Sequence, residues 1–356
     1  MKLFESFSLG EITLKNKIVM APMTRSRAIN NIPNSLMAEY YGQRANVGLI
    51  ITEGTSPTAD GIGYARIPGA YSDKQIEGWK SLASEVHKNN GHLFVQLMHC
   101  GRVSSKENLP EGETISASAI HLEGEMYTDT LGMQQHDTPK AMTMDDIVST
   151  QNGFASAATK LIETAKIDGI EIHAANGYLL DQFLNPNSNV RTDEYGGSYK
   201  NRARFVLETA QKIVDAIGPN KVGIRFSPYG IFNGMLGEYD EVVEMYSYLA
   251  EELNKMGIAY IHIADQQVAM GAPEFTTNIK KTIKGIFKGT IIVGGDVDSA
   301  EKGEALLNEG FDLVYVGRAF ISNPSLIRKF KDNTKLAQPD FETAYTPDAV
   351  GYTDYA

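Results

Sequence analysis

Three polar residues stand close together directly after a short apolar run. His173, Asn176 and Tyr178 follow residues 169–172 in the stretch IHAANGYLLDQFL. The run is typical of a β-strand and a short helical pattern follows it, so a tight turn would bring the three side chains into one small volume. The imidazole and the carboxamide could hold a carbonyl oxygen, while the phenol could protonate a developing carbanion. Taken alone, the triplet fits better a buried histidine, an Asx-type turn and a surface tyrosine.

Size and composition limit the class of protein. The chain has 356 residues, of which 42% are hydrophobic, and a formal net charge of -11. This length suits one α/β barrel as well as two smaller domains. The acidic balance argues against nucleic acid or a membrane surface as a partner. No signal-like start or spanning apolar run is present, so we expect a cytoplasmic monomer or homodimer that acts on a small molecule.

Cys100 is the only cysteine, which excludes an intrachain disulfide and a thiolate metal cluster. It directly follows His99, and adjacent residues on a strand face opposite sides. We therefore expect a buried, unreactive thiol at this position, and no metal site in the protein.

A recurring unit organises the chain: a helical stretch ends in glycine, and a short apolar strand follows within two or three residues. The glycines are Gly48, Gly91, Gly169, Gly257 and Gly310. Glycine suits the left-handed C-cap that ends a helix, so we expect that role at each position. Three further apolar strands, in KNKIVMAPM, KVGIRFSP and TIIVGGD, bring the number to eight.

The stretches between the strands have helical periodicity. Residues 239–256 carry an apolar stripe, and Thr143 can cap a second amphipathic helix. Apolar strands that alternate with amphipathic helices indicate a parallel sheet covered by helices. Eight units favour the closed (β/α)8 TIM barrel, an α/β fold, over a doubly wound sheet. The position of a dinucleotide-binding G-x-G-x-x-G turn reads APMTRS instead.

We expect a single barrel domain over the whole chain, with three additions at residues 1–17, about 100–143 and 334–356. The first is a hairpin whose Phe4 and Phe7 plug one end of the barrel. The second is too long for a simple connection and is typical of a lid with small strands of its own. The third ends in GYTDY, and covers the site, reaches a neighbouring subunit or packs on the barrel rim.

The active site of such a barrel lies at the carboxyl ends of its strands. The residues at these ends are Pro22, Met23, Thr24, Glu53, Gly54, Gln96, His99, His173, Asn176, Tyr178, Arg225, Asp265, Gly294, Gly295, Gly317 and Arg318. The set has no lysine for a Schiff base, no histidine pair at metal spacing and no carboxylate cluster for magnesium. It is rich instead in neutral and cationic hydrogen-bond donors.

Two groups within this set suit a phosphorylated ligand with an aromatic ring. Gly294–Gly295 and Gly317–Arg318 follow strands seven and eight and can offer amides and a guanidinium to a phosphate, although paired glycines also make tight turns. Gln96 and Arg225 can bracket an electron-poor heterocycle. An arginine beside a ring that becomes anionic on reduction fits a flavin better than a sugar phosphate. An ion pair with a carboxylate is the alternative for Arg225.

Motifs along nearly the whole chain resemble the Old Yellow Enzyme family of FMN-dependent ene-reductases. The segments that carry the resemblance are VMAPMTR, TEGTSP, FVQLMHCGR, HAANGYLLDQFL, NPNSNVRTDEYGGSYKNRARF, RFSP, VGGD, VGRAFISNP and the closing GYTDY. Together they run from the first strand to about Tyr355, and their combination is very specific although no single one is.

The resemblance implies FMN, bound tightly but non-covalently across the C-terminal face of the barrel. The residues implied to hold it are Pro22, Met23, Thr24, Gly54, Gln96, Arg225, Gly295, Gly317 and Arg318, to which the phosphate argument adds Gly294. Among them Thr24 matches the residue at the flavin O4 edge, and Arg225 matches the arginine near N1 and O2.

On the substrate side the assigned residues are His173, Asn176, Tyr178, Met98, Tyr64 and Tyr352. His173 and Asn176 match the pair that grips a carbonyl or nitro oxygen, and Tyr178 matches the proton donor. Met98 departs from the tryptophan that many relatives carry in QLWH, and the flexible thioether should open that wall of the site.

The resemblance implies two half-reactions. NADPH or NADH gives hydride to the flavin and departs, and an α,β-unsaturated carbonyl compound then takes hydride at its β-carbon while Tyr178 protonates the α-carbon. Reduction of nitroesters or nitroaromatics, or another FMN-barrel oxidation or reduction, is the first alternative. A flavin-binding protein without turnover and a phosphate-binding barrel isomerase are the others.

Overall fold

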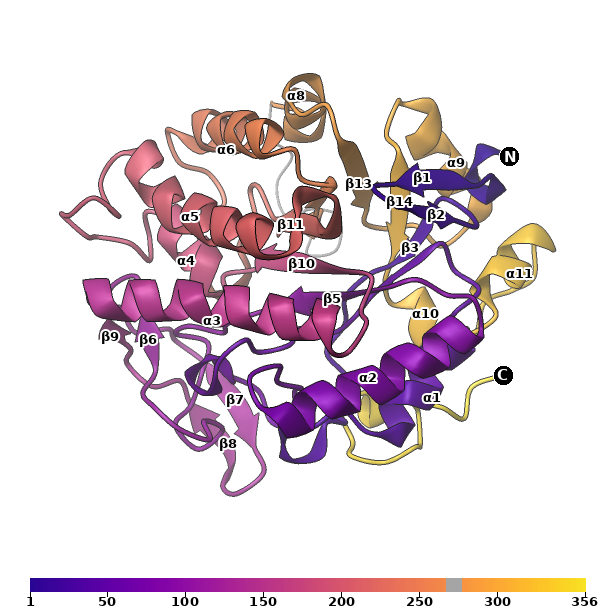
Figure 1. Ribbon diagram of the computed structural model, residues 1–356, viewed down its shortest axis with the longest axis horizontal. Coiled ribbons are helices and arrows are strands. Elements are labelled where there is room, and N and C mark those ends of the chain that lie inside the picture. The colour runs from indigo at the N-terminus through magenta and orange to yellow at the C-terminus, as the bar shows by residue number, and fades with distance from the viewer. Residues whose placement is uncertain (267–276) are drawn as a thin grey trace.

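The computed structural model of the protein describes residues 1–266 and 277–356 (Figure 1). Its centre is a closed barrel of eight parallel strands in the order β10-β11-β12-β13-β14-β3-β4-β5, which confirms the predicted fold class. The strands are β3 (Ile18–Met20), β4 (Leu49–Ile51), β5 (Leu93–Leu97), β10 (Gly169–Ala174), β11 (Val222–Phe226), β12 (Tyr260–Ile263), β13 (Thr290–Gly294) and β14 (Leu313–Val316). Since the sheet closes on itself, the doubly wound alternative is excluded.

Helices surround the barrel (Figure 1). They are α1 (Ser35–Gln43), α2 (Asp73–Lys88), α3 (Met144–Glu163), α4 (Leu179–Leu184), α5 (Tyr199–Ile217), α6 (Val242–Met256), α8 (Ile279–Ile286), α9 (Ala300–Asn308), α10 (Ala319–Ser322) and α11 (Leu326–Lys331). Thr143 caps α3 as predicted, in a capping box with Asp146. In the described ranges, no helix combines the length and apolar character needed to cross a bilayer.

Helix α6 begins at Val242, three residues later than the apolar stripe predicts. The preceding residues form a turn in which the Val242 N–H donates to the Tyr239 carbonyl at 3.1 Å. Sequence periodicity therefore places the buried face of this helix correctly but not its first turn.

The glycines before the strands have two different roles. Gly257 and Gly310 take positive φ of 71° and 99° at or just after the helix ends, as predicted for C-caps. The C-cap prediction is wrong at Gly48, Gly91 and Gly169, which do not take positive φ. A Cβ at these three positions would come within 2.1, 2.8 and 2.3 Å of a neighbouring atom. Close packing, rather than backbone conformation, requires glycine there.

The N-terminal hairpin closes one end of the barrel. Its strands are β1 (Phe7–Leu9) and β2 (Ile12–Leu14), which pair antiparallel as predicted. The buried plug residues are Leu9 and Leu14, which pack with interior side chains such as Leu49 and Leu313. Phe7, on the same face of β1 as Leu9, is partly buried and packs against this cluster as predicted, whereas Phe4 packs elsewhere and is not part of the plug.

The long insertion after β5 has small strands of its own, as predicted. β6 (Ile115–Ser116) pairs with β9 (Lys140–Ala141), and β7 (Glu125–Thr128) forms a hairpin with β8 (Gly132–Gln135). This hairpin projects at the lower left of Figure 1, on the opposite side from β1 and β2.

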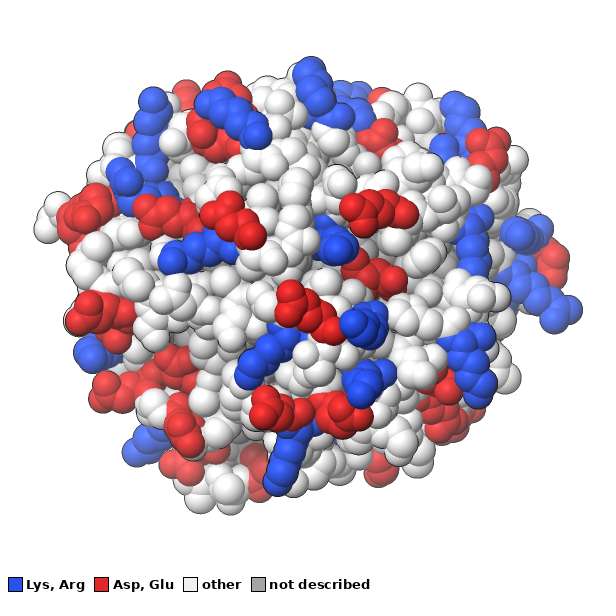
Figure 2. Space-filling model, in the orientation of Figure 1, with Lys and Arg blue, Asp and Glu red and all other residues white. Residues whose placement is uncertain are grey.

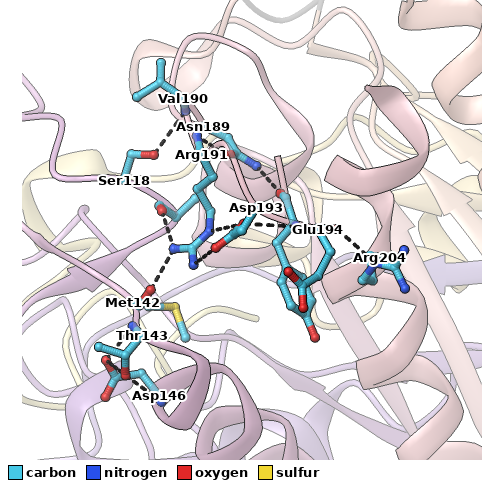
Figure 3. Close-up of polar contacts among 12 residues, drawn as sticks. Ser118, Met142, Thr143, Asp146, Asn189, Val190, Arg191, Asp193, Glu194 and Arg204 are labelled. Carbon is cyan, nitrogen blue, oxygen red and sulfur yellow. Dashed lines mark hydrogen bonds and ion pairs between the residues drawn. The ribbon is translucent and has the colours of Figure 1, made fainter. Parts of the chain in front are cut away.

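Arg191, in the loop after α4, joins the two segments of the insertion that follow β6 and β9 (Figure 3). Its Nη1 donates to the carbonyls of Ala117 at 2.9 Å and Met142 at 2.6 Å. Its other nitrogens bind both carboxylate oxygens of Asp193, at 3.0 and 2.6 Å. Such a bidentate pair fixes the plane of the guanidinium, which in turn holds the segments after β6 and β9 side by side.

The C-terminal tail packs on the barrel rim. Arg25 and Arg27, in the loop after β3, are buried and donate to tail carbonyls that include those of Thr343 and Gly351. Of the three alternatives for the tail, the described contacts are those of rim packing, and Tyr345 also reaches the cavity described below.

Candidate active site

A cavity of about 910 Å³ lies above the barrel, walled by six separate segments. Thr24 from the loop after β3, Tyr64 from the loop after β4 and Tyr178 line it together. The insertion contributes Tyr127 and Met133 from its hairpin, in agreement with the predicted cover. The tail contributes Tyr345, a residue that the sequence motifs did not indicate.

His173 and Tyr178 lie against each other beside this cavity. Their ring centroids are 4.9 Å apart at an angle of 71°. The Tyr178 hydroxyl lies 3.0 Å from the Tyr64 hydroxyl. His173 is buried, and its Nδ1 has no hydrogen-bond partner among the described residues. Since buried polar atoms are normally hydrogen-bonded, this nitrogen lacks a partner that a bound ligand would supply.

The environment sets the protonation of both rings. Burial lowers the pKa of His173, and the nearby Arg225 and His262 lower it further, so the imidazole is neutral at pH 7. Burial raises the pKa of Tyr178 well above its usual range, and neighbouring Tyr64 and Cys100 add to that rise. The phenol therefore keeps its proton until a strong base accepts it.

Asn176 occupies a tight left-handed turn between β10 and α4. Its φ is 61° and that of Gly177 is 73°. The Asn176 N–H donates to Ser227 Oγ at 2.8 Å, and the Gly177 N–H donates to the buried Asp181 carboxyl at 2.8 Å. The Asn176 Oδ1 accepts from Gln266 Nε2 at 2.6 Å. The turn is thus held from three sides, and its carboxamide has one defined orientation.

Polar side chains inside the barrel form a buried network below the site. Glu171 accepts from Gln96 Nε2 at 2.7 Å and lies 2.8 Å from His262 Nδ1. Arg225 lies above the Tyr315 ring at 5.6 Å, and its Nε has no hydrogen-bond partner among the described residues. It forms no ion pair within the described part of the chain, so the predicted alternative of a carboxylate partner finds no support there.

The loops after β13 and β14 enclose a second, smaller cavity of about 280 Å³. Gly295, Gly317 and Arg318 line it, as the phosphate argument predicts, with the tail segment 336–339 on the far side. Gly295 takes a φ of 130°, which glycine adopts readily. Gly294 is the last residue of β13 and does not line the cavity, because its Cα faces the Tyr315 carbonyl.

Four other predicted flavin residues lie in the loops after β3 and β4. Pro22, Met23 and Thr24 begin two residues after β3 ends and are partly exposed. A Cβ at Gly317 would lie 3.9 Å from Met23 Sδ, so the loops after β14 and β3 are adjacent. Gly54 is covered by Met98, whose Cε would meet a Cβ there at 2.4 Å.

Known proteins match this chain along its length. A family model for the NADH:flavin oxidoreductase / NADH oxidase family matches residues 2–337. The chain is 38% identical to 12-oxophytodienoate reductase 1 of Oryza sativa subsp. japonica, covering 99% of this chain and 92% of that protein. It is also 38% identical to chanoclavine-I aldehyde reductase fgaOx3 of Penicillium roqueforti, covering 100% and 96%. The solved structure of morphinone reductase superposes with a TM-score of 0.95 at 38% identity, covering 99% and 96%.

The chain belongs to the NADH:flavin oxidoreductase / NADH oxidase family. The resemblance to Old Yellow Enzyme is confirmed, and a solved Old Yellow Enzyme homologue from Zymomonas mobilis matches at 33% identity with a TM-score of 0.94. As a member of this family the protein is an oxidoreductase that uses FMN and a reduced pyridine nucleotide.

The side chains of this family member fit FMN. Two buried nitrogens, Arg225 Nε and His262 Nε2, lack partners among the described residues, as expected where a polar ring is to be bound. The small cavity offers glycine amides and the Arg318 guanidinium to a phosphate group. The donors and the two cavities therefore suit a ring with a phosphate at the end of its side chain.

Two residues assigned to the substrate side are absent from the wall of the large cavity of this oxidoreductase. The motifs assign Tyr352 to the substrate side, but its side chain is fully buried and stacks on Tyr40 with centroids 4.1 Å apart. The cation of Arg25 lies 5.2 Å from the Tyr352 ring, which explains why this tyrosine anchors the tail instead. Met98 is also buried and does not line the large cavity, although it packs in one cluster with Tyr178.

Residues that support the site were missed because they carry no motif of their own. Glu171 shares a strand with His173 at a spacing of two, so alternation places both on the interior face and could have indicated it. Asp181 and Gln266 contact the Asn176 turn from other elements, and only the folded chain brings them there. The expected buried thiol of Cys100 is confirmed, and burial raises its pKa to about 12.

Proposed function

We propose that this FMN-dependent oxidoreductase reduces the activated C=C bond of α,β-unsaturated carbonyl compounds. The observation that carries the proposal is the group at the end of β10. There, an unpartnered buried imidazole nitrogen of His173 lies beside the Tyr178 phenol and the fixed carboxamide of Asn176. The group combines donors for an oxygen with an acid for a carbon, which is what addition of H⁻ and H⁺ across an enone requires.

His173 and Asn176 hold the substrate oxygen in this proposal. Because the neighbouring charge of Arg225 and burial keep the imidazole neutral, His173 donates as an uncharged ring. Two donors at the carbonyl oxygen withdraw electron density from the conjugated system and stabilise the enolate that forms. When bound, FMN supplies the redox chemistry, taking hydride from the pyridine nucleotide and delivering it to the β-carbon.

Tyr178 donates the proton to the α-carbon. Its raised pKa keeps the phenol protonated, and the enolate carbon is basic enough to take the proton once hydride has arrived. The Tyr64 hydroxyl, 3.0 Å away, can donate to the phenolate oxygen that remains and so lower the energy of the product state.

The flavin residues have three roles in this proposal. Arg225 and Gln96 would bind polar atoms of the ring, and Arg225 would stabilise the negative charge that the ring gains on reduction. Gly295, Gly317 and Arg318 bind the phosphate, with Gly294 as the strand end that positions them. Pro22, Met23, Thr24 and Gly54 would hold the ring, and Met98, which lies against Gly54, would shape the nearby wall of the substrate site.

An anaerobic visible spectrum tests the proposal in one cuvette. The purified holoenzyme should be yellow, bleach with NADH or NADPH, and regain its colour when 2-cyclohexenone is added. A protein that bleaches and ignores the enone would overturn the proposed substrate class while leaving the cofactor in place. A protein that stays colourless after reconstitution with FMN would overturn the flavin assignment.

The variant Tyr178→Phe separates enone reduction from the alternative of nitro-compound reduction. We expect its enone turnover to fall by about 10²-fold or more, since general acid catalysis contributes on that order. Bleaching by NADH should be unchanged, because that half-reaction needs no acid at carbon. Full enone turnover by this variant would contradict the role of Tyr178. Because a nitro group needs no proton at carbon, nitroester turnover by this variant should be retained, and a parent enzyme that turns over nitroesters but no enone would favour the alternative.

A further inference from the structure

Gln266, three residues after β12, is joined to the substrate-binding turn by its side chain. Its Nε2 donates to Asn176 Oδ1 at 2.6 Å, across 90 positions of sequence. Its Oε1 accepts from the backbone N–H of Ile231 at 2.9 Å and of Phe232 at 3.1 Å. One amide therefore connects the Asn176 turn with the loop after β11, and Phe232 of that loop lines the large cavity.

These contacts fix the donor and the acceptor of each hydrogen bond that links Ile231 and Phe232 through Gln266 to Asn176. A backbone N–H can only donate, so the Gln266 atom that faces Ile231 and Phe232 must be the oxygen. Its nitrogen then faces Asn176, which must present its own oxygen. The Asn176 Nδ2 is consequently the end of that carboxamide left for a ligand.

The rest of Asn176 is fixed as well. Its N–H donates to Ser227 Oγ at 2.8 Å, and its carbonyl accepts from Asn233 Nδ2 at 2.8 Å. With the main chain held on both sides, rotation of the side-chain amide is the one remaining way to reverse its polarity. Gln266 opposes that rotation, since a reversed Asn176 would point its NH₂ group at the NH₂ group of Gln266.

We propose that Gln266 is a positioning residue that makes Asn176 a hydrogen-bond donor toward the substrate, and that it thereby selects ligands with an acceptor oxygen. The inference rests on the proposed function, because it assigns the carboxamide of that same site. It adds that two backbone amides of the loop after β11, acting through Gln266, set which end of the Asn176 carboxamide faces the substrate.

The variant Gln266→Glu tests the proposal by reversing the polarity at nearly constant size. The new carboxylate still accepts from Ile231 and Phe232, but toward Asn176 it can only accept. Asn176 must then turn its Nδ2 to the carboxylate and its oxygen to the ligand. We expect the dissociation constant of 2-cyclohexenone for the oxidised holoenzyme, read from the flavin absorbance, to rise about tenfold or more. FMN content should match the parent.

A double-mutant cycle removes the effect of the added negative charge. In an Asn176→Ala background the carboxylate has no amide to turn, so Gln266→Glu should weaken enone binding no further. A second variant, Gln266→Met, leaves Asn176 free to rotate and should raise the dissociation constant about two- to threefold, again only when Asn176 is present. The methionine variant provides the test if Gln266→Glu does not retain FMN.

Each outcome bears on one claim. Unchanged enone binding by Gln266→Glu, or an equal loss in the Asn176→Ala background, would overturn the inference while leaving enone reduction by the parent intact. A parent holoenzyme that bleaches with NADH but neither binds nor reduces the enone would overturn the proposed function, and this inference with it.

Discussion

Asp181 is a carboxylic acid buried beneath the substrate-binding turn. It accepts from the Gly177 N–H at 2.8 Å and lies 3.4 Å from the Ser227 hydroxyl. Burial raises its pKa to about 7 from an ordinary value of 3.8. Between about pH 4 and pH 7 the native state therefore holds a proton that the unfolded state has lost, so this group lowers stability as pH rises through that window.

The variant Asp181→Asn removes this titration and keeps an acceptor oxygen for Gly177. We expect the unfolding free energy of the variant minus that of the parent to be larger at pH 8 than at pH 5. The increase should be a few kcal/mol, because each unit of pKa shift corresponds to about 1.4 kcal/mol. Urea unfolding of the FMN-saturated proteins at both pH values measures it. The exposed Asp240→Asn is the matched control. Parallel pH trends in parent and Asp181→Asn would contradict the prediction.

At the level of elements, the insertion depends on one arginine. Arg191 donates to the carbonyls of Ala117 and Met142, which follow β6 and β9 of the insertion, and is only 10% exposed (Figure 3). Lysine keeps the charge but cannot bind both carbonyls and a carboxylate in one plane. For Arg191→Lys we expect amide exchange over residues 113–142 to accelerate about tenfold, with the barrel strands unaffected.

Arg204→Lys is the matched control, because this arginine also donates to a loop carbonyl, that of Glu194, but does not touch the insertion (Figure 3). Hydrogen exchange followed by peptide mass analysis compares the two variants. Equal protection of residues 113–142 in both would show that other contacts hold the insertion in place.

The elements also show what could be predicted from the sequence. Strands, helices and the reactive triplet repeat at regular spacing or sit at strand ends, and local patterns of polarity indicate such features. The roles of Gly48 and Gly169 depend on atoms of other elements, which would lie 2.1 and 2.3 Å from a Cβ at these positions, and local patterns carry no trace of them. The roles of Gln266 and Tyr345 could not be predicted from local sequence either, since only the closed barrel and the packed tail bring these residues to the site.

At the scale of the whole molecule, charge bears on the choice of coenzyme. The chain carries a formal charge of -11, and acidic and basic side chains are interspersed on the face in Figure 2. Around the large cavity the balance is acidic, with Glu125, Asp129 and Glu342 in its wall. Arg66 is the one lysine or arginine among the described lining residues, and it is already bound to Asp129 and to the Tyr345 carbonyl.

NADPH differs from NADH by a phosphate that adds about two negative charges at pH 7. In this acidic surrounding we expect NADH to bleach the flavin with the higher kcat/KM, by about tenfold at 20 mM salt. At 200 mM salt the difference in kcat/KM between NADH and NADPH should become smaller, because screening weakens the repulsion of NADPH more than that of NADH. Anaerobic stopped-flow bleaching with each coenzyme measures the ratio of the two kcat/KM values at each salt concentration. The variant Glu125→Gln should narrow the gap at low salt, and a preference for NADPH that grows as salt falls would contradict the charge argument.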